Sequence, residues 1–494
     1  MMIENTVAVT WTFILYLAVM LALGVIAYMR TQNLSDYILG GRNLGPIPSA
    51  LSAGASDMSG WLLLGLPGAA FANGVGASWI AIGLLVGTYL NWLFVARRLR
   101  NYSQAAKDSL TIPSFLENRF RDDTRALRVI AAFFILLFFL FYTSSGLVAG
   151  GKLFETVFGL EYQWAVIVGT LAVVSYTLFG GFLAVSWTDV VQGLLMLAAL
   201  MLVPVLAINS GEVGGWSGME ASLLEKGQGT LSLFSDANGE SLGVIAIISS
   251  LAWGLGYFGQ PHVLARFKAI SDESLVPYAR RVAVSWTAIT LIGSVFVGLA
   301  AVGYFGPEGL EDRETAFMML VDALFHPVIA GILLAAILAA IMSTADSQLL
   351  VSSSALAEDF YKGFFRPNAD AAELVRIGRV AVIVIAVIAG VVALDDDSMV
   401  LDLVSYAWAG FGAAFGPVIL LSLYWSRMNK VGALAGVVVG GLTVVVWKQL
   451  SGGLFDMYEI VPGFLFAAIA VVIGSMATGE PEKEIADEFA KVNG

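Results

Sequence analysis

Two polar groups interrupt otherwise apolar stretches, and both carry oxygen atoms that suit a hard cation. The first is Asp57, in the run 52–61. The second is a cluster of hydroxyl and carboxyl side chains, Ser343, Thr344, Asp346 and Ser347. Hydroxyl, carbonyl and carboxylate oxygens are the ligands of hard metal ions. A single serine more often bonds back to its own helix, and a single aspartate can cap a half-helix. The clustering favours cation binding.

Glycine and proline interrupt two of the apolar stretches. Glycines flank Asp57 in residues 52–61, and three glycines precede Pro261 in residues 253–261. Unwound backbone is tolerated inside a membrane only where it lines a cavity or is buried in protein. Interrupted helices at matching places in two halves of a chain indicate a transporter site between inverted repeats. Close helix packing is the alternative for any one glycine.

Aromatic residues beside the second interruption could wall a binding site. Trp253 and Tyr257 are four residues apart and face the same way on a helix. Tyr142 is a third candidate, although aromatic belts at membrane surfaces are the alternative for each residue alone. His262 and Arg266 follow, and we expect them on a solvated inner rim.

The elements that carry these residues are apolar enough to cross a membrane. Of the 494 residues, 58% are hydrophobic and 13% are charged, which is unlike a soluble protein. Repeated long apolar runs predict an all-α polytopic membrane protein with about thirteen transmembrane helices. Their approximate limits are 7–29, 44–72, 75–96, 127–150, 163–180, 187–209, 243–262, 282–305, 326–352, 375–394, 399–425, 431–449 and 458–477.

The distribution of basic residues predicts the orientation. With the N-terminus outside, nearly all of the 26 lysines and arginines lie in or beside cytoplasmic segments. The exceptions are Lys152, Lys226, Arg313 and Lys448. Residues 1–478 then form a single transmembrane domain, and residues 479–494 form a polar cytoplasmic tail that we expect to be mobile.

Composition also weighs against several functions. The net charge of −12 argues against a nucleic-acid partner, and the absence of cysteine excludes disulfides and thiol chemistry. No histidine–carboxylate cluster or nucleophile–base pair supports an enzyme. A sensor module fused to a kinase would need a longer tail, and a channel would not need paired broken helices. No obligatory protein partner is evident.

Five runs of this sequence resemble the solute:sodium symporter family and, within it, the bacterial sodium/proline symporters. They are DYILGGR (36–42), LSAGASDMSGW (51–61), GGFLAVSWTD (180–189), WGLGYFGQPHVLARF (253–267) and SYAWAGFGA (405–413). The resemblance implies a leucine-transporter-type core of two inverted five-helix repeats, at about 44–209 and 243–426. The extra helices would be those at about 7–29, 431–449 and 458–477.

The same resemblance implies a function and a place in the cell. It implies import of L-proline by symport with sodium through alternating access, across a bacterial plasma membrane. L-proline, sodium and the lipid bilayer are then the partners. The alternative is sodium symport of another small organic solute, such as a sugar or pantothenate.

The resemblance also assigns site residues by position. The implied sodium ligands are the carbonyls of Ala55, Met58 and Ala340 and the hydroxyls of Ser343 and Thr344, with Asp57 matching the aspartate needed for sodium-dependent transport. The implied substrate site comprises Ser59, Trp61, Tyr142, Trp253, Tyr257 and Pro261. Asp189 and Arg42 match family positions near the cytoplasmic side. Asp346 departs from the family pattern, so its contact with sodium stays open.

Overall fold

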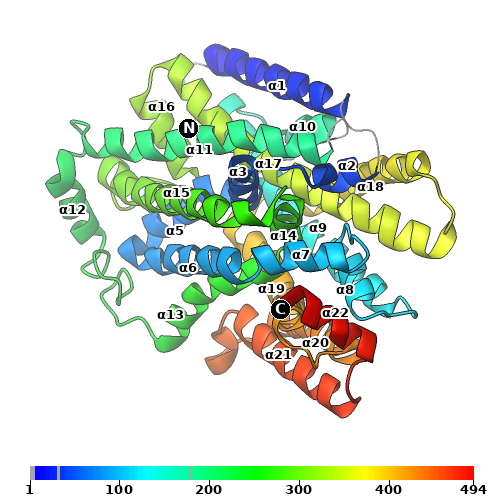
Figure 1. The fold of residues 1–494 in the computed structure, drawn as a ribbon. Helices are drawn as coiled ribbons and strands as arrows, with labels where there is room; N and C mark the ends of the chain where they lie inside the picture. The colour runs from blue at the N-terminus through cyan, green and yellow to red at the C-terminus, as the bar shows by residue number, and fades with distance from the viewer. Residues whose placement is uncertain (1–5, 30–33, 178–180, 494) are drawn as a thin grey trace.

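A computed structural model describes residues 6–29, 34–177 and 181–493 of the chain (Figure 1). Gly180, which begins the third family-like run, and Arg30 lie outside these ranges. The described residues are mostly helical and contain no β-strand, only isolated bridges between Leu44 and Ile270 and between Ser235 and Ser241. The predicted all-α class is therefore confirmed for the described part of the chain.

Long apolar helices make up the body of the molecule. They are α1 (Thr6–Tyr28), α6 (Ser78–Phe94), α9 (Ala126–Phe158), α10 (Tyr162–Thr177), α11 (Phe182–Ile208), α15 (Val276–Phe305), α17 (Pro327–Ser354), α18 (Ala371–Val392), α19 (Val400–Tyr424), α20 (Lys430–Trp447) and α21 (Ile460–Ala477). Shorter pieces form two interrupted segments: α3 (Pro46–Asp57), α4 (Gly60–Leu63) and α5 (Gly65–Asn73), then α13 (Val244–Leu251), the 3-10 helix η3 (Ala252–Gly259) and α14 (Pro261–Ala269).

Short helices cover the two ends of the bundle. They are α2 (Leu34–Leu39), α7 (Ala96–Ala105), α8 (Ile112–Arg119), α12 (Gly215–Lys226), α16 (Ala316–Leu324) and α22 (Lys483–Asn493). The remaining 3-10 turns are η1 (Gly40–Arg42), η2 (Gly74–Ala77), η4 (Glu273–Leu275), η5 (Arg313–Thr315) and η7 (Gly453–Asp456), and η6 (Ala355–Phe365) is a π-helix that continues α17.

The expected number of thirteen spans is not confirmed. Among the described residues, ten helices are long and apolar enough to cross a membrane, or eleven if the bent pair of 244–259 and 261–269 counts as one span. Each predicted range does contain helix. The difference arises because parts of the second and third predicted spans are counted together as one stretch, Gly60–Phe94, and because α10 is short.

The helices that carry the candidate residues lie at the centre of the bundle. Helix α17 packs against α1, α3, α9, α11 and α18, and α19 packs against α9, α20, α21 and η3. Figure 1 shows α1 at the periphery, where large apolar side chains such as Trp11 and Leu15 are exposed. An apolar outer surface of this kind suits contact with lipid.

Glycines bring α6 and η3 into direct backbone contact. A Cβ atom placed on Gly87 would lie 2.3 Å from the carbonyl oxygen of Gly254, and one placed on Gly83 would lie 2.4 Å from that of Leu251, which ends α13 just before η3. Residues larger than glycine would therefore force these two elements apart.

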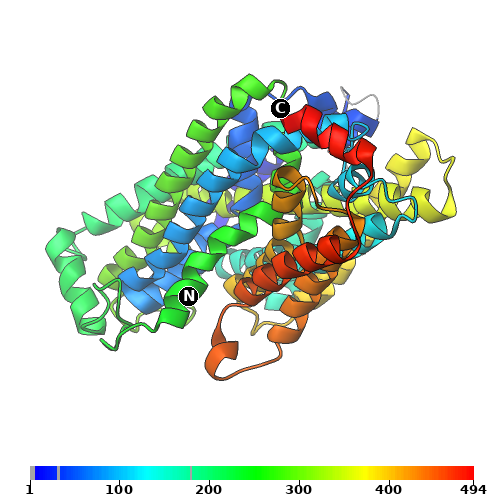
Figure 2. The same ribbon diagram turned by 60° about the horizontal axis from the view of Figure 1, so that its bottom comes forward.

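The tail differs from its predicted mobility. Residues 483–493 form α22, which lies beside α7 at the opposite end of the molecule from α12 (Figure 2). Phe489 lies 6.3 Å from the Tyr102 ring, and Arg119 stacks over Phe489 at 5.4 Å. Arg121 pairs with Glu484. The helix is amphipathic, and its apolar side packs against the surface formed by Tyr102 and Arg119.

Candidate functional site

Both predicted interruptions are present. Helix α3 ends at Asp57, and Ser59 is extended (φ −65°, ψ −161°) before α4 begins. In the second segment Gln260 is extended (φ −74°, ψ 108°), and Pro261 opens α14 at a bend of 47°. Proline suits the first turn of a helix because its missing N–H would have no helical partner there.

Asp57 lies at the centre of the site and is almost fully buried, with 1% of its surface exposed. The hydroxyl of Tyr257 donates to Asp57 Oδ2 at 2.6 Å, and the hydroxyl of Tyr142 donates to the Asp57 carbonyl at 2.7 Å. Within the described residues, Oδ1 accepts no hydrogen bond. A buried carboxylate oxygen without a partner is costly, so this atom is suited to a ligand.

An aromatic cluster surrounds these bonds: Trp61, Tyr142, Trp253, Tyr257 and Trp408. The ring centroids of Trp61 and Trp253 are 6.2 Å apart, and those of Tyr257 and Trp408 are 5.0 Å apart. Trp408 also donates its indole N–H to the Trp253 carbonyl at 2.7 Å. Apolar faces with a few polar tips fit a small ligand that has both a hydrocarbon and a charged part.

Trp408 is the member that sequence reasoning missed as a wall residue. It lies in the run 405–413, which resembles the family, but nothing in its spacing connects it to Trp253. Gly256 permits the contact, because a Cβ atom there would lie 1.9 Å from the indole nitrogen of Trp408.

A hydroxyl–carbonyl cluster lies on the other side of the unwound segment: Ala55, Ala340, Ser343 and Thr344. The Ser343 hydroxyl lies 2.8 Å from the Ala55 carbonyl oxygen and 3.1 Å from that of Ala340. The Thr344 hydroxyl lies 3.4 Å from the Ala55 carbonyl oxygen. These buried oxygens are the donor set that a desolvated alkali cation takes.

The remaining predicted residues lie at the edges of these two clusters. Met58 follows Asp57 directly, and no hydrogen bond joins it to Ser343 or Thr344 in the part of the chain that the structure describes. The Ser59 hydroxyl caps α4 by accepting from the Trp61 N–H at 3.5 Å. Pro261 lines a separate cavity beyond the aromatic cluster.

The expected solvated rim at His262 and Arg266 is wrong, because both residues are fully buried. Arg266 forms an ion pair with Asp189 at 3.3 Å and donates to the hydroxyls of Ser52 (3.0 Å) and Ser347 (2.5 Å). Their burial comes from tertiary packing, since α3, α7 and α17 all lie against α14. The result is a buried polar network between α3, α11, α14 and α17.

Asp346 and Arg42 are also placed away from the hydroxyl–carbonyl cluster. The carboxylate of Asp346 accepts from the Thr177 hydroxyl on α10. Arg42 pairs with Asp108 at 2.8 Å and donates to the Lys268 carbonyl at 2.8 Å. Burial lowers the pKa of the Arg42 guanidinium, and the Asp108 carboxylate opposes that shift.

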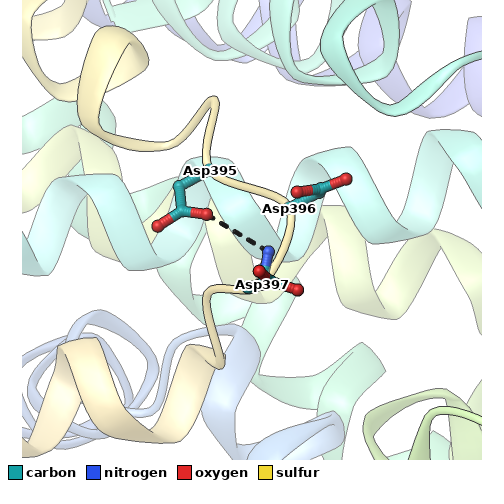
Figure 3. A group of neighbouring side chains, drawn as sticks. All are labelled: Asp395, Asp396 and Asp397. Carbon is teal, nitrogen blue, oxygen red and sulfur yellow. Dashed lines mark hydrogen bonds between the residues drawn. The ribbon is translucent and has the colours of Figure 1, made fainter.

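One group of acidic residues that the sequence analysis did not consider lies on the loop between α18 and α19. Asp395, Asp396 and Asp397 are exposed, and their carboxylate oxygens lie within 4.8 Å of one another (Figure 3). The Asp397 backbone N–H donates to Asp395 at 3.3 Å. The group is outside both clusters, and exposed acidic groups are common without an ion.

Comparison with known proteins supplies the family. Residues 37–440 match the family described as the sodium:solute symporter family. The chain belongs to the sodium:solute symporter family. As a member it is a sodium-coupled transporter rather than an enzyme, and the sodium ion is a co-transported substrate.

Relatives in this family match almost the whole chain. The high-affinity proline transporter PutP of Bacillus subtilis (strain 168) is 50% identical over 473 residues, covering 95% of this chain and 98% of the relative. The sodium/proline symporter of Escherichia coli (strain K12) is 49% identical over 488 residues, covering 98% of this chain and 95% of the relative.

Solved structures show the fold that this symporter shares. A sodium-coupled sialic acid symporter in a substrate-bound outward-open state aligns with a TM-score of 0.79 at 20% identity, covering 96% of this chain and 99% of that one. MhsT in complex with L-phenylalanine aligns with a TM-score of 0.53 at 14% identity, covering 87% and 98%. The fold is of the leucine-transporter type.

Proposed function

We propose that the protein imports L-proline by symport with sodium through alternating access across a bacterial plasma membrane. Relatives that are about half identical over nearly the whole chain carry the names proline transporter and sodium/proline symporter. One observation from the structure supports the coupling. The last turn of α3, beside the unwound residues, joins the hydroxyl–carbonyl cluster, through Ala55, to the aromatic cluster, through Asp57.

In this proposal sodium binds among the carbonyls of Ala55, Met58 and Ala340 and the hydroxyls of Ser343 and Thr344. Asp57 supplies negative charge close to that site, and Tyr257 and Tyr142 hold it in place. A cation that draws in the Ala55 carbonyl would set the position of the adjoining segment at Asp57.

Proline binds in the same proposal against the aromatic cluster, with Ser59 and Pro261 at its edges. Proline carries an apolar ring and opposite charges, and it does not cross a bilayer easily. Trp61 and Trp253 offer faces for the ring, while the positive end of the α4 helix dipole can attract the carboxylate.

The energy for accumulation comes from sodium. One positive charge moving across about 100 mV releases about 2.3 kcal/mol, and a roughly tenfold sodium gradient adds about 1.4 kcal/mol. The total of about 3.7 kcal/mol supports roughly 500-fold accumulation at one sodium ion per proline. Sodium must favour the state that binds proline, because equal binding to both states shifts nothing.

The architecture belongs to the same proposal. Residues 44–209 and 243–426 form two inverted repeats, with α1, α20 and α21 as additional helices. The N-terminus lies outside, and residues 479–494 lie in the cytoplasm, as the distribution of lysine and arginine favours.

The test is uptake of labelled L-proline into proteoliposomes with and without an inward sodium gradient. We expect uptake that requires sodium and that does not run on a proton gradient alone. Equal uptake in sodium-free buffer would refute the coupling. If an unlabelled sugar or pantothenate competes better than proline, the solute is the alternative one.

A further inference from the structure

A cavity lies beyond Pro261, between the helices of the candidate site and the short helices that close one end of the bundle. Its volume is about 30 Å³, and it is lined by parts of α2, α8, α9, α11, α14 and α17. Most of its lining is apolar. Two charged residues also face it, Lys268 at the end of α14 and Asp359 in η6.

Lys268 is a buried lysine with no carboxylate bonded to its side chain among the described residues. Only 1% of its surface is exposed, and its ammonium donates to the Leu110 carbonyl at 2.6 Å. Among the described residues no carboxylate lies within ion-pair distance of its Nζ atom. A buried ammonium bonded to a neutral carbonyl is poorly compensated, and a carboxylate would bind it about twice as strongly.

Asp359, on the same cavity, has a carboxylate whose hydrogen bonding is incomplete. It is fully buried, and its Oδ1 atom accepts from Arg128 at 2.6 Å and from the Thr111 hydroxyl at 3.3 Å. Its Oδ2 atom has no hydrogen-bond partner in the part of the chain that the structure describes. Asp359 lies in a π-helix, a rare conformation that is often found at functional sites.

The cavity lies on a continuation of the candidate site. Leu350 lines it, and this residue is two helical turns beyond Ser343 on α17, or about 10 Å at 1.5 Å per residue. Pro261 lines it from α14, directly after the segment that carries Tyr257. Leu110 also lines the cavity, and Arg42 donates to the Lys268 carbonyl at 2.8 Å.

We propose that this cavity is a second, transient subsite for a zwitterionic amino acid on its way to the cytoplasm. The proposal rests on the proposed function, because it takes proline as the transported solute. The Lys268 ammonium receives the carboxylate, and Asp359 Oδ2 receives a hydrogen bond from the amino group. A volume of about 30 Å³ admits only a water-sized group, so the amino acid enters as the Leu110 segment moves away.

The same contact links the substrate to release. In the closed arrangement the ammonium holds the Leu110 carbonyl. An arriving carboxylate is the stronger acceptor and displaces that carbonyl. The segment at residues 106–111 then loses one of its attachments to α14, and the inner end opens while the substrate is held.

The test compares half-saturating proline on the two sides of the membrane. Lys268→Met removes the charge at similar length, and Lys268→Gln keeps an N–H donor for Leu110. We expect either variant to raise half-saturating proline about tenfold from the cytoplasmic side, measured in inside-out vesicles. Half-saturating proline from the outside, in right-side-out vesicles, should change less than twofold. Asp359→Asn should also raise half-saturating proline on the cytoplasmic side.

Lys226→Met is the matched control. Lys226 is also a partly buried lysine bonded to a backbone carbonyl, that of Pro307 at 2.7 Å, but it lines a cavity at the other end of the molecule. This control should leave proline affinity on the cytoplasmic side unchanged.

Three outcomes would overturn the subsite. Unchanged cytoplasmic affinity in a folded Lys268→Gln protein would show that the charge is not used. Normal cytoplasmic proline affinity in Lys268→Gln together with weakened affinity in Lys268→Met would show that Lys268 acts only through its hydrogen bond to Leu110. A tenfold loss of proline affinity on both sides of the membrane would show that Lys268 does not act through a subsite on the cytoplasmic side. Wild-type protein that fails to take up proline with sodium would refute the proposed function instead.

Discussion

Removing the hydroxyl of Ser343 should raise the sodium requirement of transport by about 10- to 100-fold. The hydroxyl oxygen lies 2.8 Å and 3.1 Å from the carbonyl oxygens of Ala55 and Ala340. Interactions of a neutral polar group with a charge contribute about 1.5–3 kcal/mol, and about 1.4 kcal/mol corresponds to a factor of ten. Ser343→Ala leaves the aromatic cluster intact and favours the helix. Thr344→Ala should raise the sodium requirement less, because the Thr344 hydroxyl lies 3.4 Å from the Ala55 carbonyl oxygen.

The assay is a sodium titration of proline uptake, followed by a proline titration at saturating sodium. Binding of the two ligands shares one coupling energy, so a weaker sodium site lowers proline affinity only through that coupling. High sodium should therefore largely restore proline affinity in Ser343→Ala. Ser352→Ala is the control, since Ser352 is buried on the same helix and its hydroxyl has no hydrogen-bond partner among the described residues.

Two results would refute this reasoning. A Ser343→Ala protein with normal sodium dependence and lost proline binding would show that the hydroxyl holds substrate. An equal effect of Ser352→Ala would show that the loss comes from the helix as a whole rather than from the cation site.

Three further predictions follow from single contacts. Tyr257→Phe removes the donor to Asp57 Oδ2 (2.6 Å) but keeps the ring, so half-saturating proline should rise about tenfold while the amount of protein in the membrane stays normal. Gly87→Ala places a Cβ atom 2.3 Å from a facing carbonyl oxygen, and thermal unfolding in detergent should show a loss of about 1–3 kcal/mol; an unchanged Tm would contradict the contact. Phe489→Ala removes the ring beside Tyr102, and limited proteolysis should then release the C-terminal helix faster than in the wild type.

The interruptions of the helices could be predicted because their causes are local. Glycines and Pro261 weaken the helix within a few residues of where it breaks. The meeting of Ser343 with Ala55 was expected from the family resemblance rather than from local pattern, since 288 residues separate them. That they do lie together is compatible with the predicted cation site, which stays a prediction until sodium binding is measured.

Other features depend on tertiary contacts that no local pattern contains. The burial of Arg266 follows from its contacts with distant residues on α3, α11 and α17, whereas its position near an expected membrane edge suggests exposure. Trp408 joins the aromatic cluster across a space that only Gly256 leaves open. The polar composition of residues 479–494 predicts a mobile tail, and it gives no sign of the contact that Phe489 makes with Tyr102.

The backbone contact between α6 and η3 has a mechanical consequence. At Gly87 and Gly254 no side chains separate the two elements, so neither can slide along the other without first moving apart. Contacts made by side chains, such as those of Arg266 with Ser52 and Ser347, can break and re-form one at a time. We therefore expect the two elements to move together during the proposed alternating access, and a pair of spin labels placed on them should then report the same separation in every state of the cycle.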